Sequence, residues 1–152
     1  MLRQTLILAF TLVSALLVCP LADGQSTSVV ELKSQNCEID EANFNTVRVA
    51  ALPIANAGGS VIVIARRGGD DLRNLNRQRL TATKEWLAKA HFPMGQLVTA
   101  EGSRTRGNGR LEIYVGGKLT HIILARPSAG LCTECCNPRP EDFYRDRTRR
   151  GR

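Results

Sequence analysis

The sequence is poor in the residues that most often carry catalysis. It contains two histidines, His91 and His121, and one tryptophan in 152 residues, and aromatic residues make up only 5% of the chain. No Ser/His/Asp set, metal-binding motif with histidines or pair of carboxylates stands at a useful spacing. We therefore expect no enzymatic activity and no cofactor, and we expect a core built mainly from aliphatic side chains.

Long apolar segments are scarce as well, and the most marked one stands at the N-terminus. A basic start at Arg3 is followed by an apolar stretch from Leu6 to Val18 and then by the small residues Ala22-Asp23-Gly24. This order is typical of a secretory signal peptide. The stretch of about 13 residues is shorter than the ~20 residues that span a bilayer. We predict a signal peptide over residues 1–24, cleavage before Gln25, and no transmembrane segment in the mature chain.

Two alternatives to cleavage at this position remain open. One is an uncleaved membrane anchor, and the other is a lipoprotein acylated at Cys19, although Val18 is larger than the residue that usually precedes a lipidated cysteine. The prediction that we carry forward is a periplasmic or secreted protein.

Acidic residues are fewer than basic ones, with Asp+Glu 14 against Lys+Arg 21 and a formal net charge of +7. Such an excess favours an anionic partner, which in an exported protein would be anionic lipid or an anionic cell-wall polymer. Nucleic acid is not expected, because no aromatic stacking surface accompanies the arginines. The protein partner, if there is one, has no signature. Arginines crowd residues 137–152, which we expect to form a basic disordered tail.

Of the five cysteines, all but Cys19 follow the predicted cleavage site: Cys37, Cys132, Cys135 and Cys136. In an oxidising compartment such a set predicts disulfides. We expect one or two, with Cys37 bonded to one member of the C-terminal cluster, so that the start of the domain is tied to its end. A zinc site and free or intermolecular thiols remain as alternatives, although vicinal Cys135-Cys136 is a poor clamp for a metal.

Hydrophobic patterning predicts two helices and four strands in one domain over residues 37–136, preceded by a flexible segment over residues 25–36. The first helix is expected over 40–56, with Asp40 as its N-cap and with Pro53 stopping or kinking its regular part near Ala51. The second is expected over 72–91. Strands are expected over 60–65, 96–100, 110–115 and 118–125.

These elements predict an α+β fold, a two-layer sandwich with two helices packed on a small mixed β-sheet. The β-branched run Val61-Ile62-Val63-Ile64 is typical of a central parallel strand that is buried on both faces. The helix that follows it favours a parallel pairing with the next strand. The last two strands read as a hairpin, because Gly116-Gly117 separates them.

One residue breaks the pattern of the second helix. Arg79 lies near the middle of the apolar arc that the other inward positions define: Leu72, Leu75, Leu80, Thr83, Trp86, Leu87 and Ala90. A guanidinium there needs an anion, because an isolated buried charge is very costly. A structural salt bridge to Asp70, Asp71 or Glu112 satisfies that need, and so does a bound carboxylate or other anionic ligand. The third alternative is a helix that begins later and leaves Arg79 on a frayed first turn.

The stretch from Val61 to Glu112 resembles a shortened OmpA-like domain, the peptidoglycan-binding module of many bacterial envelope proteins. The similarity lies in the apolar strand Val61–Ile64, the basic helix start Leu75-Asn76-Arg77-Gln78-Arg79-Leu80, and the strand Leu97-Val98-Thr99-Ala100-Glu101-Gly102. It ends at Asn108-Gly109-Arg110-Leu111-Glu112, where the family has Asn-Arg-Arg-Val-Glu. The resemblance covers about a third of the chain and implies an OmpA-like sandwich with an added C-terminal hairpin strand.

The resemblance also implies a candidate site. In that family a helix arginine and an aspartate after the strand grip the diaminopimelate of the peptide stem. Arg79 matches the helix arginine and Arg110 the closing arginine, whereas Ala65-Arg66-Arg67-Gly68 replaces the family's Gly-His-Thr-Asp. Asp70 and Asp71 are the candidate substitutes. We expect a structural or protein-interaction module with a degenerate site, and the alternative is peptidoglycan binding through Arg79.

Overall fold

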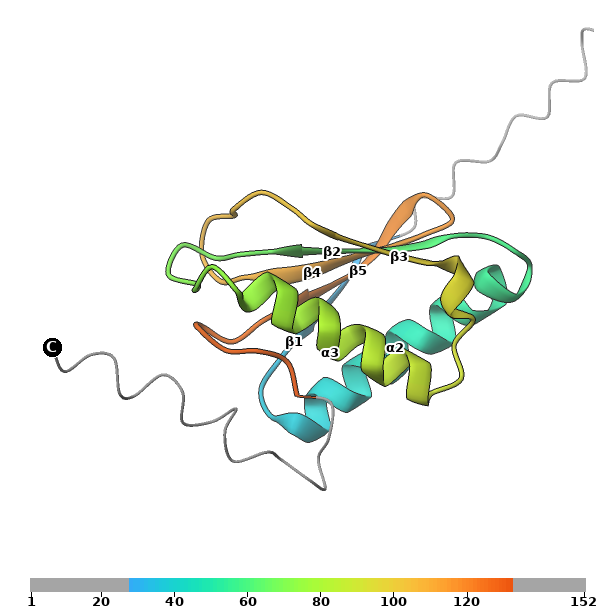
Figure 1. The fold of residues 1–152 in the computed structure, drawn as a ribbon, viewed down its shortest axis with the longest axis horizontal. Helices are drawn as coiled ribbons and strands as arrows, with labels where there is room; N and C mark the ends of the chain where they lie inside the picture. Colours follow the sequence, from blue (N-terminus) through green and yellow to red (C-terminus); the bar gives the residue numbers. More distant parts are fainter. Residues whose placement is uncertain (1–27, 133–152) are drawn as a thin grey trace, which may run out of the picture.

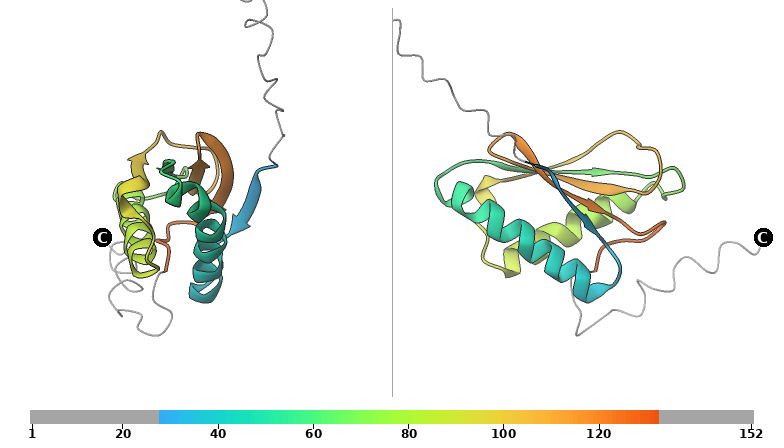
Figure 2. Two further views of the ribbon diagram at one scale, coloured as in Figure 1. Left: turned by 90° about the vertical axis from the view of Figure 1, so that its right-hand side faces the viewer. Right: turned by 180° about the vertical axis from the view of Figure 1, so that it is seen from behind.

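Five strands form one mixed sheet, and two helices pack against one of its faces (Figure 1). The computed structural model describes residues 28–132. In chain order the elements are β1 (Val30–Lys33), α2 (Cys37–Asn56), β2 (Val61–Arg66), α3 (Leu75–Lys89), β3 (Leu97–Glu101), β4 (Arg110–Val115) and β5 (Lys118–Leu124), with a 3₁₀ turn at Met94–Gln96. The two views in Figure 2 show both helices on the same side of the sheet. The predicted α+β class is confirmed.

The sheet has the strand order β1-β5-β4-β2-β3. As the helix between them predicts, β2 and β3 are parallel, from Val61↔Leu97 to Ala65↔Glu101. Strands β4 and β5 form the predicted hairpin, and both Gly116 and Gly117 take positive φ (57° and 81°) in its turn. Two consecutive residues in that conformation match the twist of a two-residue hairpin and favour glycine.

The first strand was not expected, and the prediction of a flexible segment over residues 25–36 is wrong for its second half. Strand β1 pairs in parallel with β5, from Val30↔His121 to Lys33↔Leu124. It is a four-residue edge strand whose residues are mostly exposed, so its Val-Glu-Leu-Lys alternation is too short and too polar to stand out in the sequence. The sheet therefore begins before Cys37.

Helix α2 begins earlier than predicted, at Cys37, and it ends at the predicted residue, Asn56. Its N-cap is Asn36, whose side-chain Oδ1 accepts a hydrogen bond from the Ile39 amide at 2.9 Å. The assignment of Asp40 as N-cap is wrong, because Asp40 lies in the first turn of the helix, after Asn36, and is buried there. Pro53 does not end the helix, which continues to Asn56 with the proline carbonyl accepting from the Ala57 amide.

Strand β2 is central, as predicted, but only one of its faces is fully buried. Its residues alternate between buried and half-buried positions, with Val61, Val63 and Ala65 toward the helices. Its neighbours are parallel β3 on one side and antiparallel β4 on the other. The continuous β-branched run therefore marks a strand in the middle of a sheet whose second face is not covered by either helix of residues 28–132.

Helix α3 is shorter than its predicted range of 72–91. It spans Leu75–Lys89, and Leu72 lies before it with half of its surface exposed. The inward arc is otherwise as predicted, since Leu75, Leu80, Thr83 and Leu87 are all buried. The frayed-start alternative for Arg79 does not hold, because Arg79 lies in the second turn of the helix.

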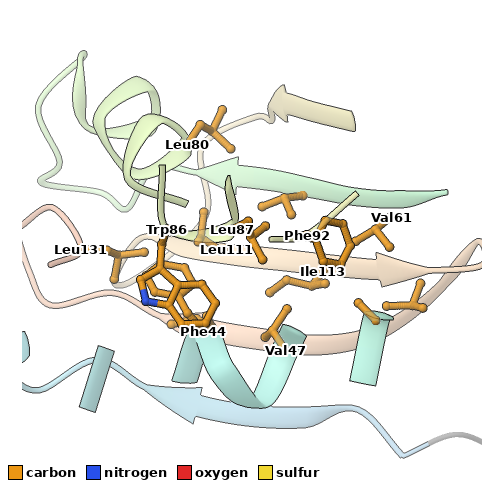
Figure 3. Packing of buried hydrophobic residues seen from close by; sticks show 14 of the residues in the cluster. Phe44, Val47, Val61, Leu80, Trp86, Leu87, Phe92, Leu111, Ile113 and Leu131 are labelled. Carbon is orange, nitrogen blue, oxygen red and sulfur yellow. The ribbon is translucent and has the colours of Figure 1, made fainter. Parts of the chain in front are cut away.

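The core lies between the helices and the sheet and is mostly aliphatic (Figure 3). Phe44 of α2 and Trp86 of α3 stack with ring centroids 5.6 Å apart, which joins the two helices directly. Leu131, beyond the last strand, also belongs to this core. The segment from β5 to Leu131 is thus part of the packed domain.

Candidate functional site

Arg79 and Asp71 form a buried ion pair at one end of the sheet. Arg79 Nη1 donates to Asp71 Oδ2 at 2.6 Å, and the Arg79 side chain is 0% exposed. Of the three carboxylates considered from sequence, Asp71 is therefore the partner of Arg79. The pair connects the first half of α3 with the loop that leads into it.

The other edge of the guanidinium faces the chain that follows β5. We call residues 126–132 the strap. Arg79 Nε and Nη2 both donate to the carbonyl oxygen of Ala129, at 3.2 and 2.8 Å. The Ser128 amide donates to Asp71 Oδ1 at 3.2 Å. The strap therefore covers both members of the ion pair with backbone groups, and it leaves no open face on Arg79.

Gly109 closes the ion pair from the side of the sheet. A Cβ atom at this position would collide with Arg79 Nη1 and with Asp71 Oδ2. Gly68 is equally confined, because a Cβ there would meet the backbone of residues 107–109. The β2–α3 and β3–β4 loops also share a hydrogen bond from the Gly69 amide to the Gly107 carbonyl. The Arg79–Asp71 pair is therefore the point where four segments meet: the β2–α3 loop, the β3–β4 loop, α3 and the strap.

The pKa of Asp71 reflects these contacts. Burial alone raises it, but the hydrogen bond from Arg79, the amides of Gly68 and Ser128 and the charge of Arg79 together lower the pKa below its usual value. Asp71 is thus ionised at neutral pH, and its two oxygens accept hydrogen bonds from Arg79 and from the amides of Gly68 and Ser128. As an ionised and fully bonded carboxylate it is not suited to act as a general acid or base near pH 7.

A small cavity of about 140 Å³ lies beside the pair, at the surface of the same loops. Asp70 lies at its wall, and its backbone carbonyl accepts a bond from Ser128 Oγ at 3.3 Å. The cavity is lined by Gly69, Asp70, Asp71, Gly107, Asn108, Pro127 and Ser128. Arg79 is not part of this lining, so the cavity offers a ligand no access to the guanidinium.

Arg110 lies apart from Arg79, and it belongs to a second charge cluster. Glu112 is nearly buried, and it receives Arg110 Nη2 at 2.7 Å and Arg66 Nε at 2.8 Å. Tyr114 also donates its hydroxyl to Glu112 at 3.3 Å. Burial raises the pKa of Glu112, but the bonds from Arg66 and Arg110 outweigh it and lower the pKa. Arg79 and Arg110 therefore do not converge on a common ligand position.

Asp40 holds the far end of the strap. It is almost fully buried in the first turn of α2, its Oδ2 accepts from the Cys132 amide at 3.0 Å, and Arg126 Nη2 lies 3.9 Å from the same oxygen. Its other oxygen, Oδ1, has no hydrogen-bond partner within the described residues. Asp40 is therefore not a local helix cap but the partner of a residue at the other end of the domain.

A disulfide joins Cys37 and Cys132, 95 residues apart in sequence. This confirms the expected link between the start of the domain and its end. Cys135 and Cys136 lie outside the described residues, as do Cys19, the predicted signal peptide and the predicted tail. Among residues 28–132 no group of three His, Cys, Asp or Glu side chains could hold a metal ion.

The two histidines differ in environment. His91 is exposed and takes φ 56° just after α3, whereas His121 on β5 is buried with Nδ1 3.0 Å from Thr120 Oγ1. Burial lowers the pKa of His121. In residues 28–132 neither histidine lies in an arrangement that resembles a catalytic triad.

Acidification is expected to destabilise the domain in two steps. Because the pKa of His121 is lower in the folded protein, the imidazole takes up a proton at higher pH in the unfolded chain than in the folded one. The free energy of unfolding is therefore highest above about pH 6.5, and it falls as the pH drops below that value. The lowered pKa values of Asp71 and Glu112 act in the same direction below about pH 4. Urea unfolding from pH 7 to pH 3 measures both steps.

One variant separates the two steps. His121→Gln is expected to flatten the change between pH 7 and 5 and to leave the change below pH 4 in place. A wild-type free energy of unfolding that stays constant down to pH 3 would contradict the assigned pKa directions.

No known protein family matches the chain, and no curated protein or solved structure matches it either. In the part of the chain that the structure covers, neither helix combines the length and hydropathy that a membrane-spanning segment needs.

Proposed function

We propose that this chain is an exported, non-catalytic domain that acts as a structural or protein-interaction module. The observation that carries the proposal is the closure of the Arg79–Asp71 pair. The one charged group on the inward face of α3 has its bonds directed to Asp71 and to the strap, with no exposed surface. Such a group contributes to fold stability and loop position.

The uncovered face of the sheet is the surface that suits a protein partner. Both helices lie on the opposite face (Figure 2). Residues paired across β3, β2, β4 and β5 place apolar side chains beside one another on this face, and Val98 is half exposed. The apolar members are Ile62, Ile64, Val98, Tyr114, Leu119, Ile122 and Leu124. Apolar surface around the charged Glu112 cluster resembles an interface with a polar component.

Site-specific photocross-linking tests this assignment. A photoreactive residue at Ile122, on the uncovered face, is expected to trap a defined envelope protein, and Ile62→Asp is expected to abolish the trapping. The matched control places the same group at Val49 on α2, which is 59% exposed. Equal products from both positions, or none from either, would contradict an interface on this face.

The alternative function is binding of the diaminopimelate of peptidoglycan through Arg79. It requires the strap to leave the guanidinium, because Ala129 O now occupies its Nε and Nη2 donors. Co-sedimentation of the mature protein with purified diaminopimelate-type peptidoglycan distinguishes the two functions. Our proposal expects the oxidised protein to stay in the supernatant.

If the protein does sediment with peptidoglycan, two variants distinguish specific binding through Arg79 from attraction by charge. Arg79→Lys keeps the charge but not the paired donors, so loss of binding in this variant alone would favour the peptidoglycan alternative. Loss only in a chain that ends at Asn137 would show that the basic C-terminal residues attract the polymer by charge.

A further inference from the structure

We infer that the strap is a redox-dependent latch, which the Cys37–Cys132 disulfide holds closed over the Arg79–Asp71 pair. Reduction of the disulfide opens the strap and leaves the sheet and both helices folded. This inference goes beyond the proposed function, because it concerns access to a buried site and holds whichever partner the domain binds.

The contacts of the strap fall into two groups. In its middle, the Ser128 amide and the Ala129 carbonyl bind Asp71 and Arg79, and Ser128 Oγ donates to the Asp70 carbonyl. Arg126, at the start of the strap, lies 3.9 Å from Asp40. At its end, the Cys132 amide binds Asp40, and the disulfide joins the strap to the first residue of α2. Between the groups, the side chain of Leu131 enters the core (Figure 3). The disulfide is the one covalent element among these contacts.

Without the disulfide, the strap is held by non-covalent contacts, namely hydrogen bonds, the Arg126–Asp40 pair and the buried side chain of Leu131. The strap forms no helix or strand, and Ser128 has a left-handed φ of 52°. Of its seven residues, Leu131 is buried, Pro127 is exposed and the other five are half-buried. Ordering such a segment costs conformational entropy at every residue. Segments with few buried contacts open locally before the rest of a domain unfolds.

The ion pair itself survives opening. Arg79 and Asp71 lie on α3 and on its preceding loop, and neither belongs to the strap. When the strap leaves, water can bind the donors that Ala129 releases, so no charge is left unpaired in the interior. Opening therefore exposes the Nε and Nη2 edge of Arg79, which carries parallel donors for an anion.

The switching chemistry is ordinary thiol–disulfide exchange with a dithiol reductant. One reductant thiolate attacks a sulfur of the Cys37–Cys132 bond and forms a mixed disulfide, and the other cysteine leaves as a thiolate. The second reductant thiolate then displaces the protein sulfur. The reductant ends as a disulfide, and Cys37 and Cys132 end as two protonatable thiolates after a two-electron reduction.

The position of the two cysteines favours this exchange. Both are half-buried, so a reductant can reach them. Cys37 is the first residue of the 20-residue helix α2. A helix N-terminus stabilises a thiolate, which makes Cys37 the better leaving group when Cys132 is attacked.

Hydrogen exchange and arginine labelling of the mature chain test the latch. Cys135→Ser/Cys136→Ser is used as background, so that only the Cys37–Cys132 bond responds to dithiothreitol. On reduction we expect amides in residues 126–132 to exchange at least roughly tenfold faster, while β4 amides stay protected. Phenylglyoxal is expected to label Arg79 only after reduction. Arg77, exposed on the same helix, is the internal control and is labelled in both states.

Two outcomes would overturn the inference. If strap exchange and Arg79 labelling do not change, the strap stays closed without the disulfide. If β4 loses protection to the same extent as the strap, the disulfide holds the whole domain together and is no latch. A Cys37→Ser/Cys132→Ser variant without reductant must reproduce the reduced state, which separates the loss of the bond from other effects of dithiothreitol.

Discussion

Replacement of Arg79 by alanine is expected to lower the free energy of unfolding by about 3–5 kcal/mol. The substitution leaves the Asp71 carboxylate buried without its cation, and it removes both donors from the Ala129 carbonyl. Breaking one partner of a buried pair is costly because the remaining charge keeps its desolvation penalty. Urea unfolding of the oxidised protein at pH 7, followed by Trp86 fluorescence, measures the change.

Arg77→Ala is the matched control for this prediction. Arg77 precedes Arg79 by two residues on α3 and is exposed, so its replacement is expected to change the free energy of unfolding by less than about 0.5 kcal/mol. If Arg79→Ala is as mild as Arg77→Ala, the guanidinium does not stabilise the fold, and a role in ligand binding becomes the better account of its position.

Gly109→Ala is expected to have the second-largest effect, a loss of about 3 kcal/mol. The added methyl group would occupy the space of Arg79 Nη1 and Asp71 Oδ2. It would also lie 2.9 Å from the Arg66 carbonyl oxygen, so it cannot shift away from the ion pair on that side. The ion pair must therefore separate, or the β3–β4 loop must move away from α3. Chemical unfolding measures the loss, and the near-ultraviolet circular dichroism spectrum shows whether the core remains packed.

A glycine in the same loops provides the control. Gly69 has no atom within 4 Å of the position that a Cβ would take, so Gly69→Ala is expected to stay within about 0.5 kcal/mol of the wild type. Equal effects of the two substitutions would show that loop flexibility, and not contact with the ion pair, determines the stability change.

Much of the fold follows from local sequence patterns. The β-branched run from Val61 to Ile64 predicts β2, and the spacing of Leu75, Leu80 and Leu87 predicts the inward face of α3. The connection between β2 and β3 through a helix predicts their parallel pairing, and Gly116-Gly117 predicts the last hairpin. Each of these signals depends on residues close together in the chain, which is why sequence alone is sufficient for them.

The errors arise where distant residues decide the outcome. Strand β1 is defined by pairing with β5, almost a hundred positions away, and its four residues carry little signal. Aspartate is a residue type that is common at N-caps, but Asn36 takes that role in α2. The Asp40 carboxylate instead accepts a hydrogen bond from the Cys132 amide. Sequence patterns near α2 contain no information about a partner at the other end of the domain.

The candidate site was found in part. The wheel of α3 identifies Arg79 as a charge that needs a partner, and Asp71 is among the partners that sequence suggests. The sequence does not predict that Gly109 and Ala129 close the pair, because neither residue has functional chemistry in its side chain. Only a glycine flanked by charged and polar residues, as in Asn108-Gly109-Arg110, hints at a close approach of the backbone.

The most direct test of the account is the coupling energy between Arg79 and Asp71 in a double-mutant cycle. The free energies of unfolding of wild type, Arg79→Met, Asp71→Asn and the double variant are measured at pH 7 with the disulfide intact. A buried, mutually dependent pair predicts a coupling of about 2–3 kcal/mol, so that the double variant loses less stability than the two single variants lose together. Additive losses, with a coupling below about 0.5 kcal/mol, would contradict the central role of this pair in closing the site.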